Sequence, residues 1–307
     1  MKNVLVATEK PFSESAITKI VSVLKDADYN VTVLSKYSDV KQLYDAVANA
    51  NAMIVRSDKI TPEVISHAPD LEIVVRAGAG FDNIDLLSTK ERGIVVENTP
   101  GQNANAVAEL VAGMTIMACR NFYDGSTGFE MRWKRIGIHG FGNVGKSLSK
   151  IANGMGMYVF FYDTYVPFEE SYNYGVVGIE DLNYFYKNCQ IISLHIPLRP
   201  ETAKSVNYDL MMSMPKDAIL INTARSEIID EDALLKVFED RSDFRYLADV
   251  SPTNKDIIAE RFPGRYFFTP KKLGAQTSEA NMNAGVAAAN QIVEFFTTGS
   301  RKFQVNK

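Results

Sequence analysis

Short apolar runs alternate with longer helical segments along almost the whole chain. The runs NVLVAT at residues 3–8 and LEIVVRAG at 71–78 have the length of buried strands. A serine-capped amphipathic stretch, SESAITKIVSVLKDA at 13–27, follows the first of them. Strands and helices that alternate in this way build a parallel sheet with helices on both faces. The pattern therefore predicts the α/β class.

The alternation restarts near residue 101, which indicates a second domain. There NANAVAELVAGMTIMACR predicts a helix, and KRIGIHGFGNVG predicts a strand that runs into a glycine loop. A chain of 307 residues is longer than one typical core requires. We expect two doubly wound parallel-sheet domains, one formed by 1–100 plus 274–307 and the other by 101–273. The helix expected from about Ser278 has no strand after it, so we expect it to pack on the first domain.

Composition narrows the classes of partner. A net charge of −4 argues against nucleic acid, which requires a basic face, but leaves room for a local anion pocket. The most apolar long segment contains Glu109 and is shorter than a bilayer span, so no membrane partner is expected. Cys119 and Cys189 lie in apolar stretches and are expected to be buried small hydrophobes. The apolar run after Met1 is too short for a signal peptide, and we expect a cytoplasmic location.

The segment GFGNVG contains the GxGxxG pattern at Gly140, Gly142 and Gly145. A predicted strand precedes it and a predicted helix follows, the context in which this pattern binds a dinucleotide pyrophosphate. The next predicted strand ends on Asp163, where an acid would hold a ribose and favour NAD over NADP. The alternative is a tight strand–helix turn without a ligand. The cofactor-binding residues expected here are Gly140, Gly142, Asn143, Val144, Gly145 and Asp163.

Two further strand ends carry polar residues that would face the same ligand. Arg225 ends DAILINTAR, and its guanidinium can clamp a carboxylate and polarise a keto oxygen. Thr223 and Ala224, just before it, are expected to contact the cofactor. Asp249 ends the following strand and is expected to hold the nicotinamide amide, the alternative being a helix or loop cap. The alternative for Arg225 is that it is a surface arginine at a strand end.

The first domain gathers positive charge after two predicted strands. Arg56, Lys59 and Arg76 follow or end those strands, and the peptide N–H groups of residues 77–80 would form an anion-binding concavity. This arrangement predicts an anionic substrate between the domains, and lone surface charges are the alternative. The substrate-binding residues expected here are Arg56, Ser57, Lys59, Arg76, Ala79 and Gly80.

Taken together, the chain resembles the D-isomer-specific 2-hydroxyacid dehydrogenase family over nearly its whole length. The resemblance rests on RSDKIT, VVRAGAGFDNIDL, ERGIVVENTPGQNANAVAEL, GFGNVG, SLHIPLRPET, INTAR and TPKKLGAQT. It implies a Rossmann NAD-binding domain inserted into a flavodoxin-like substrate domain, a homodimer, and hydride transfer between NAD and a 2-hydroxy acid. Arg225 matches the catalytic arginine, Asp163 the ribose-binding acid, and His195 a cofactor-binding position. Asn103 lies where family members contact substrate and nicotinamide.

The chain departs from the family pattern at the acid/base. Family members have a histidine after the TP motif and a supporting glutamate, whereas here two lysines follow Pro270 and Asn254 stands at the glutamate position. Alignment of LGAQT puts Lys272 at the histidine position, and alignment of TP puts Lys271 there; we favour Lys272. A neutral lysine amine can accept the hydroxyl proton and its ammonium can return it. The alternative is that both lysines are solvated charges on a surface loop.

These departures are typical of short family members that act on 3-phosphoglycerate and have lysine in place of the histidine. The resemblance thus implies NAD-dependent oxidation of a phosphorylated 2-hydroxy acid with Arg225 and Lys272 or Lys271 as catalytic residues. Two alternatives stay open: a 2-keto acid reductase for a substrate without phosphate, and a non-catalytic NAD sensor that has lost its acid/base. No metal ligands are expected.

Overall fold

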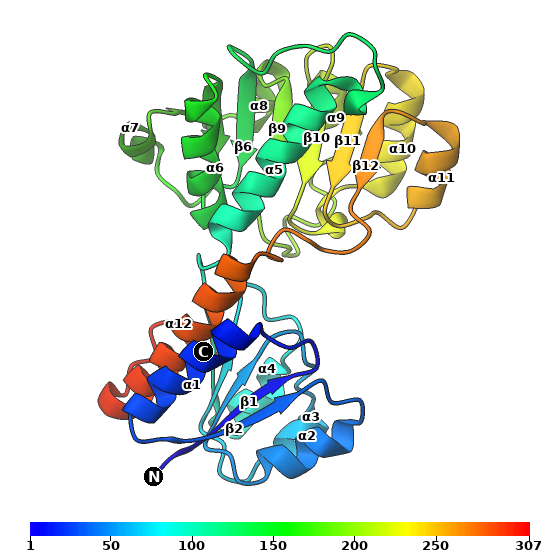
Figure 1. The fold of residues 1–307 in the computed structure, drawn as a ribbon. Helices are drawn as coiled ribbons and strands as arrows, with labels where there is room; N and C mark the ends of the chain where they lie inside the picture. Colours follow the sequence, from blue (N-terminus) through cyan, green and yellow to red (C-terminus); the bar gives the residue numbers. More distant parts are fainter. The chain divides into compact units, whose positions relative to one another are not determined.

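The computed structural model describes residues 1–307 and divides the chain into two compact units. Unit 1 consists of Met1–Asn103 and Gln276–Lys307, and unit 2 consists of Ala104–Ala275 (Figure 1). The borders lie within a few residues of those expected from the sequence. None of the helices combines the length and the hydrophobicity that crossing a bilayer requires.

Unit 1 is built on a five-stranded, fully parallel sheet. Its strands are β1 (Asn3–Thr8), β2 (Asn30–Ser35), β3 (Ala52–Val55), β4 (Ile73–Arg76) and β5 (Val95–Asn98). They lie in the order β2-β1-β3-β4-β5. This is the 2-1-3-4-5 order of flavodoxin-like sheets, and it confirms the fold class predicted for this part of the chain.

Helices cover both faces of this sheet. They are α1 (Glu14–Asp26), α2 (Val40–Val47), α3 (Pro62–Ser66), α4 (Leu86–Glu91) and α12 (Ser278–Thr298). On one face α1 and α12 pack together, with Ile20, Ala288 and Ile292 buried among the strand residues. A Cβ at Gly285 of α12 would lie 2.4 Å from the Ile20 Cδ1 atom, so only glycine lets the two helices approach this closely. The C-terminal helix therefore completes the core of unit 1.

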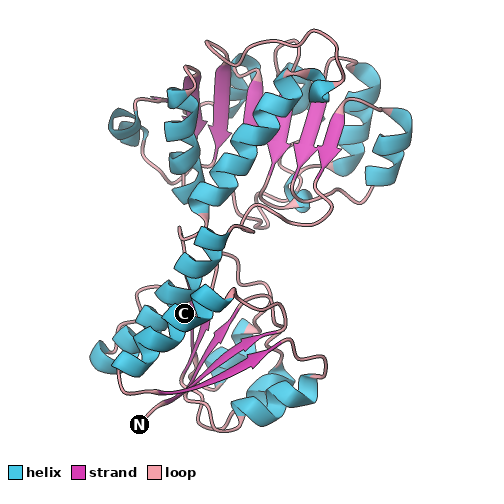
Figure 2. Cartoon of the chain, in the orientation of Figure 1, coloured by secondary structure: helices cyan, strands magenta, loops and turns pink.

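Unit 2 contains a seven-stranded parallel sheet in the order β12-β11-β10-β9-β6-β7-β8 (Figure 2). Its strands are β6 (Arg135–His139), β7 (Tyr158–Tyr162), β8 (Val177–Gly178), β9 (Ile191–Leu194), β10 (Ile219–Asn222), β11 (Arg245–Ala248) and β12 (Tyr266–Phe268). Numbered from β6, the order is that of a Rossmann sheet with one extra edge strand. Both predicted doubly wound sheets are thus confirmed.

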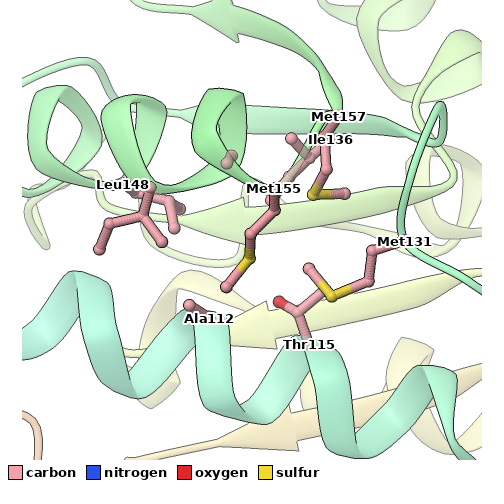
Figure 3. A pocket seen from close by; sticks show the side chains of 9 residues that line it. Ala112, Thr115, Met131, Ile136, Leu148, Met155 and Met157 are labelled. Atoms are coloured by element: carbon pink, nitrogen blue, oxygen red, sulfur yellow. The ribbon is translucent and has the colours of Figure 1, made fainter.

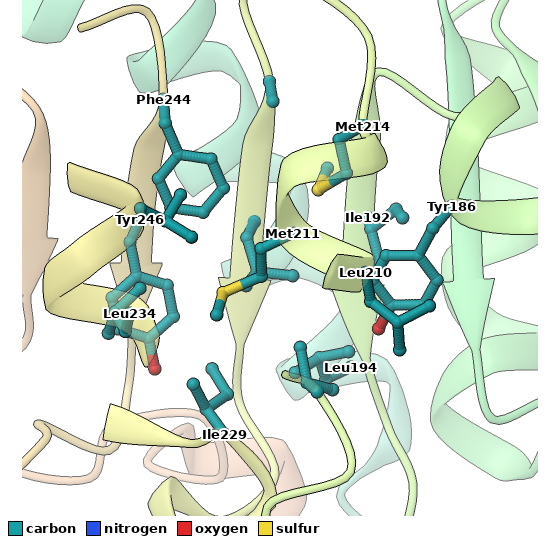
Figure 4. Close-up of a cluster of buried hydrophobic side chains, with 14 of the residues drawn as sticks. Tyr186, Ile192, Leu194, Leu210, Met211, Met214, Ile229, Leu234, Phe244 and Tyr246 are labelled. Atoms are coloured by element: carbon teal, nitrogen blue, oxygen red, sulfur yellow. The ribbon is translucent and has the colours of Figure 1, made fainter. Parts of the chain in front are cut away.

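The helices of unit 2 divide between the two faces of its sheet. They are α5 (Ala104–Cys119), α6 (Asn143–Gly154), α7 (Ser171–Tyr174), α8 (Leu182–Asn188), α9 (Tyr208–Ser213), α10 (Glu231–Asp240) and α11 (Lys255–Arg261). Alternate strand residues face opposite sides, so Leu220 packs with Tyr186 and Met211 of α8 and α9 (Figure 4). On the other side, α5 packs against β10, where Ile219 and Ile221 are buried, and α6 packs against β6 and β7; methionine side chains lie between the two helices (Figure 3).

All seven strands are parallel, so their carboxyl ends lie along one edge of the sheet. His139, Asn222, Ala248 and Phe268 end four of these strands. The glycine loop, the segment with Arg225, Asp249 and the two-lysine loop follow them directly. The topology therefore brings the predicted functional residues of unit 2 to one edge, where doubly wound sheets bind ligands.

Candidate active site

The three glycines of the loop between β6 and α6 differ in whether the fold would tolerate a side chain in their place. Gly140 has a φ of +99°, and a Cβ there would lie 2.8 Å from the backbone carbon of His195. A Cβ at Gly145 would lie 2.4 Å from the Gly140 carbonyl oxygen. The fold itself therefore requires both. At Gly142, by contrast, nothing lies within 4 Å of a Cβ, so this glycine leaves open space beside the loop.

That open space lies at the N-terminus of α6. Gly142 is the N-cap residue, and no side chain caps the helix, although α1, α2, α8, α10 and α12 all have a side-chain cap. The N–H groups of the first turn have no partner within the helix, and the helix dipole adds partial positive charge. An exposed, uncapped N-terminus beside a glycine fits an anion such as a dinucleotide pyrophosphate.

Asp163 is held against this loop. One of its carboxylate oxygens accepts a hydrogen bond from the Phe141 amide at 2.7 Å, and the other accepts from the amides of Tyr165 and Val166 at 2.8 and 3.0 Å. The carboxylate thus ties the end of β7 to the glycine loop and stays half-buried. This is the position from which an acid reaches the ribose of a dinucleotide.

The two histidines near the loop are packed as neutral groups. His139 is 5% exposed and hydrogen bonds through Nδ1 to the Tyr186 hydroxyl at 3.1 Å. Burial lowers the pKa of His139 to about 4. His195 bonds Ser193 Oγ through Nε2 at 2.9 Å, and burial lowers its pKa also. The His195 backbone, rather than its ring, contacts Gly140. Cys119 and Cys189 are buried thiols, as the sequence predicted.

Arg225 follows β10 in a turn organised by Asn222. The buried Asn222 side chain accepts a hydrogen bond from the Ala224 amide at 2.9 Å and donates to the Arg225 carbonyl at 2.8 Å. Arg225 Nη1 donates to the Ala224 carbonyl at 2.9 Å. Thr223 is buried, and its hydroxyl oxygen has no partner in the chain. An orphan hydroxyl next to a strand end is a feature that a bound ligand would satisfy.

The structure distinguishes the two lysines after β12. Lys272 Nζ donates to the Ala224 carbonyl at 3.4 Å, the same oxygen that Arg225 Nη1 binds. Both lysines are exposed, but no hydrogen bond or ion pair involves the Lys271 side chain. One backbone oxygen therefore brings the Lys272 ammonium and the Arg225 guanidinium together at the carboxyl end of β10. Sequence alignment left this assignment open.

The Asp249 carboxylate accepts hydrogen bonds from the loop that follows β12. Asp249 is 2% exposed, and its Oδ1 atom accepts hydrogen bonds from Thr269 Oγ1 at 2.8 Å and the Leu273 amide at 2.6 Å. Its Oδ2 atom accepts from the Gly274 amide at 2.7 Å. Asn254, at the position of the family glutamate, donates to the Glu231 carbonyl at 2.9 Å, and its own Oδ1 is buried without a partner.

In unit 1, the Arg56 guanidinium is engaged mainly by other parts of the same unit. Its Nη1 donates to the carbonyls of Lys10 and Pro11 at 3.2 and 3.1 Å, its Nη2 donates to Asn281 of α12, and it lies over the Phe12 ring. Burial lowers the pKa of its guanidinium. Arg56 thus binds two distant segments together, a contact that no local sequence pattern reveals. Ser57 and Lys59 are exposed on the same loop.

The segment after β4 keeps half of the predicted anion-binding amides. The Ala77 and Gly78 amides are used, since they donate to the carbonyls of Val55 and Arg76 at 2.8 and 2.9 Å. The amides of the next two residues, 79 and 80, have no acceptor in the chain. Arg76 Nε donates to the Arg56 carbonyl at 3.0 Å, which places its guanidinium beside this segment. Asn103 directly precedes α5.

Sequence reasoning passed over Asp58, which organises the loop after β3. Asp58 is 2% exposed and accepts hydrogen bonds from the Glu9 amide at 2.6 Å, the Tyr37 hydroxyl at 2.7 Å and the Arg56 amide at 3.2 Å. The available signal was a single acid among the basic residues of RSDK. No group of three His, Cys, Asp or Glu side chains is arranged to hold a metal ion.

A cavity of about 340 Å³ in unit 2 lies away from all these residues. It is lined by Ile116, Cys119, Arg120, Phe129, Glu130, Met131, Arg132 and Met155. None of the residues predicted from the sequence to bind substrate or cofactor contributes to it. The site is therefore described by the strand-end residues and not by this cavity.

Comparison with known proteins gives consistent matches. Residues 104–263 match the family model described as D-isomer specific 2-hydroxyacid dehydrogenase, NAD binding domain. The chain is 32% identical to D-3-phosphoglycerate dehydrogenase of Methanocaldococcus jannaschii over 92% of its own length and 55% of that protein. The chain thus spans about half the length of this relative.

Two further matches cover most of both proteins. The chain is 31% identical to hydroxypyruvate reductase of Thermotoga maritima, covering 85% of this chain and 89% of that protein. A crystal structure of 3-phosphoglycerate dehydrogenase from Entamoeba histolytica with bound NAD⁺ has a TM-score of 0.90 and 43% identity. That match covers 100% of this chain and 99% of that one.

Proposed function

The chain belongs to the D-isomer specific 2-hydroxyacid dehydrogenase family, and from this premise we propose that it oxidises 3-phosphoglycerate to 3-phosphohydroxypyruvate, the opening step of serine synthesis. NAD is the cofactor, and when bound it supplies the hydride acceptor. The uncapped α6 helix beside Gly142 holds the pyrophosphate, and Asp163 holds the adenosine ribose. Thr223 and His195 complete the cofactor-binding residues.

The observation that carries the proposal is the shared contact of Lys272 and Arg225 with the Ala224 carbonyl. A 2-hydroxy acid needs a group that takes the hydroxyl proton and a cation that binds the carboxylate and the oxygen on carbon 2. The Lys272 amine accepts that proton during oxidation and its ammonium returns it during reduction. Arg225 binds the oxygens, because a guanidinium donates two parallel hydrogen bonds. Lys271 makes no such contact, which favours Lys272.

Unit 1 contributes the groups for the anionic end of the substrate. Lys59 is exposed, and the amides of Ala79 and Gly80 have no acceptor in the chain. We assign the phosphate to these groups together with Arg76 and Ser57. Arg56 contributes less than the sequence predicted, since Lys10, Pro11 and Asn281 already engage its guanidinium.

The test is the rate of NADH oxidation on addition of 3-phosphohydroxypyruvate. We expect wild type to turn over, Lys272→Ala to lose at least about a hundredfold in kcat, and Lys271→Ala to stay within about threefold of wild type. NADH affinity, followed by fluorescence, should not change in either variant. A wild type that binds NADH but leaves the substrate untouched would refute the proposed activity and favour the NAD sensor.

A second candidate substrate is a 2-keto acid without phosphate. The engagement of Arg56 favours it, because that leaves fewer cations for a phosphate, and one relative is a hydroxypyruvate reductase. The assay with hydroxypyruvate decides between the two. Preference for the phosphorylated substrate, and competition by inorganic phosphate, support the first candidate; indifference to phosphate supports the second. We further propose that the chain forms a homodimer in the cytoplasm. Light scattering tests the oligomeric state.

A further inference from the structure

We propose that Asp249 is a positioning residue for Lys272: its carboxylate fixes the two-lysine loop so that the amine lies beside Arg225. This inference rests on the proposed function, because it concerns the proton-transfer step of that reaction. This role is additional to the nicotinamide contact expected from the sequence.

The carboxylate joins the two ends of the loop 269–274. It accepts from the Thr269 hydroxyl where the loop begins and from the Leu273 and Gly274 amides where it ends. Pro270 and the two lysines lie between these anchors. Apart from the Thr269 amide, which donates to the Ala248 carbonyl at 3.0 Å, the backbone of this loop forms no helical or strand hydrogen bonds, so the three bonds to Asp249 are its main anchors. The Asp249 carboxylate and the three residues that donate to it are buried or partly buried, which shields the bonds from water.

The anchored amide of Leu273 acts directly on Lys272. The peptide bond between them is planar, so a fixed Leu273 N–H also fixes the plane that contains the Lys272 Cα atom. That N–H donates to Asp249 at 2.6 Å. Lys271 is one rotatable residue further from the anchor and has no contact of its own. The clamp therefore acts on Lys272 through the peptide bond next to it.

The same carboxylate is tied to the Arg225 turn through the sheet. The Asp249 amide donates to the Asn222 carbonyl at 3.0 Å, and the Asn222 side chain binds the Ala224 amide and the Arg225 carbonyl. One continuous set of hydrogen bonds thus runs from Arg225 through Asn222 and Asp249 to Leu273. It sets the spacing between the guanidinium and the Lys272 ammonium.

Gly274 shows how closely this carboxylate is packed. A Cβ at Gly274 would lie 2.9 Å from Asp249 Oδ2 and 3.3 Å from a methyl carbon of Val107. Alanine at this position would push the carboxylate from the loop while keeping its charge. Asp249→Asn does the opposite, since it keeps the shape but turns an amide NH₂ toward backbone donors. The two variants disturb the same clamp by independent means.

The experiment is a double-mutant cycle on kcat and on NADH affinity. We expect Asp249→Asn and Gly274→Ala to lower kcat about ten- to a hundredfold, because misplacement of a catalytic group by about 1 Å has effects of this size. NADH affinity, measured in parallel, separates this loss of kcat from any change in cofactor binding. In a Lys272→Ala background, either change should lower the residual rate less than about twofold, because the residue that Asp249 positions is already absent.

Asp243→Asn is the matched structural control. Asp243 precedes β11 as Asp249 follows it, and its carboxylate accepts from the Asp217 amide at 2.7 Å and from Arg241. The control should lower the melting temperature without the loss of kcat in folded protein. Thr269→Val removes one anchor and should give a smaller loss of kcat in a stable protein.

Two results would overturn the inference. One is an Asp249→Asn variant that binds NADH at least tenfold more weakly and still slows Lys272→Ala, which would assign Asp249 to the nicotinamide. The other is an Asp249→Asn variant whose kcat equals that of Asp243→Asn. If wild type turns over no 2-keto acid, the proposed function fails separately. Amide hydrogen exchange then decides on the clamp: faster exchange at 273–274 in Asp249→Asn supports it, and unchanged exchange overturns it.

Discussion

Gly142→Ala tests whether the N-terminus of α6 holds the cofactor pyrophosphate. A methyl group at this position meets nothing within 4 Å, and the φ of −75° is one that L-residues adopt. The folded chain should therefore accept the change with a cost below about 1 kcal/mol, the difference between glycine and alanine at an N-cap. The same methyl group would occupy the space in which we place the pyrophosphate.

The expected effect on binding follows from the hydrogen bonds that the methyl group would displace. A hydrogen bond to a charged group contributes about 1.5–3 kcal/mol, and every 1.4 kcal/mol is a factor of ten in Kd. Loss of one amide–phosphate bond should thus weaken NADH binding roughly tenfold to a hundredfold. Gly140→Ala and Gly145→Ala should behave differently from Gly142→Ala. Their Cβ atoms would meet backbone atoms at 2.8 and 2.4 Å, so these two changes should destabilise the fold itself.

The assay is NADH fluorescence titration together with urea unfolding for each variant. Gly154→Ala, at the other end of α6, is the control, since a Cβ there also meets nothing within 4 Å. It should leave NADH affinity unchanged and stabilise the chain by up to about 1 kcal/mol. Wild-type NADH affinity in a folded Gly142→Ala protein would refute the placement of the pyrophosphate at α6.

Two other predictions concern acid stability and Arg225. Burial lowers the pKa of His139 to about 4, so below the unfolded value of ~6.5 the unfolded chain binds more protons and stability falls as pH drops toward 4. About 2 kcal/mol of the stability lost between pH 7 and pH 5 in urea unfolding should be absent in His139→Gln, while His195, whose pKa burial also lowers, keeps its own contribution in both proteins; equal losses would contradict this. Arg225→Lys should lower kcat/KM about a hundredfold at unchanged NADH affinity, because an ammonium lacks the bidentate fork; a change below threefold would argue against a carboxylate clamp.

The fold was predictable because its signals are local. Most strands are short runs with several apolar residues, and the glycine loop is flanked by the strand and helix that it requires. The two-residue strand β8 (Val177–Gly178) is too short to leave such a pattern. The site was predictable only in part, since its decisive contacts are long-range. Arg56 Nη2 donates to Asn281 across 225 positions in the chain, and Lys272 Nζ donates to the Ala224 carbonyl across 48.

Our proposal that Lys272 is the acid/base predicts the pH dependence of the rate. Only a neutral amine accepts the hydroxyl proton, and the ordinary pKa of a lysine is ~10.4 against ~6.5 for a histidine. Oxidation should therefore keep accelerating well above neutral pH in wild type. An imidazolium would need a carboxylate for stabilisation, but the side chain at position 254 is an amide, and Asp249 already accepts three hydrogen bonds from the loop.

Lys272→His is the variant that tests this argument. Its oxidation rate should level off near pH 6.5–7.5, where an unassisted imidazole loses its proton, and its maximum should lie below that of wild type because no acid supports the ring. The measurement is kcat for 3-phosphoglycerate oxidation from pH 6 to pH 10 in both proteins. If the two profiles rise at the same pH, the titrating group is not residue 272. Lys271→His, whose side chain has no contact with the Arg225 turn, should keep the wild-type profile.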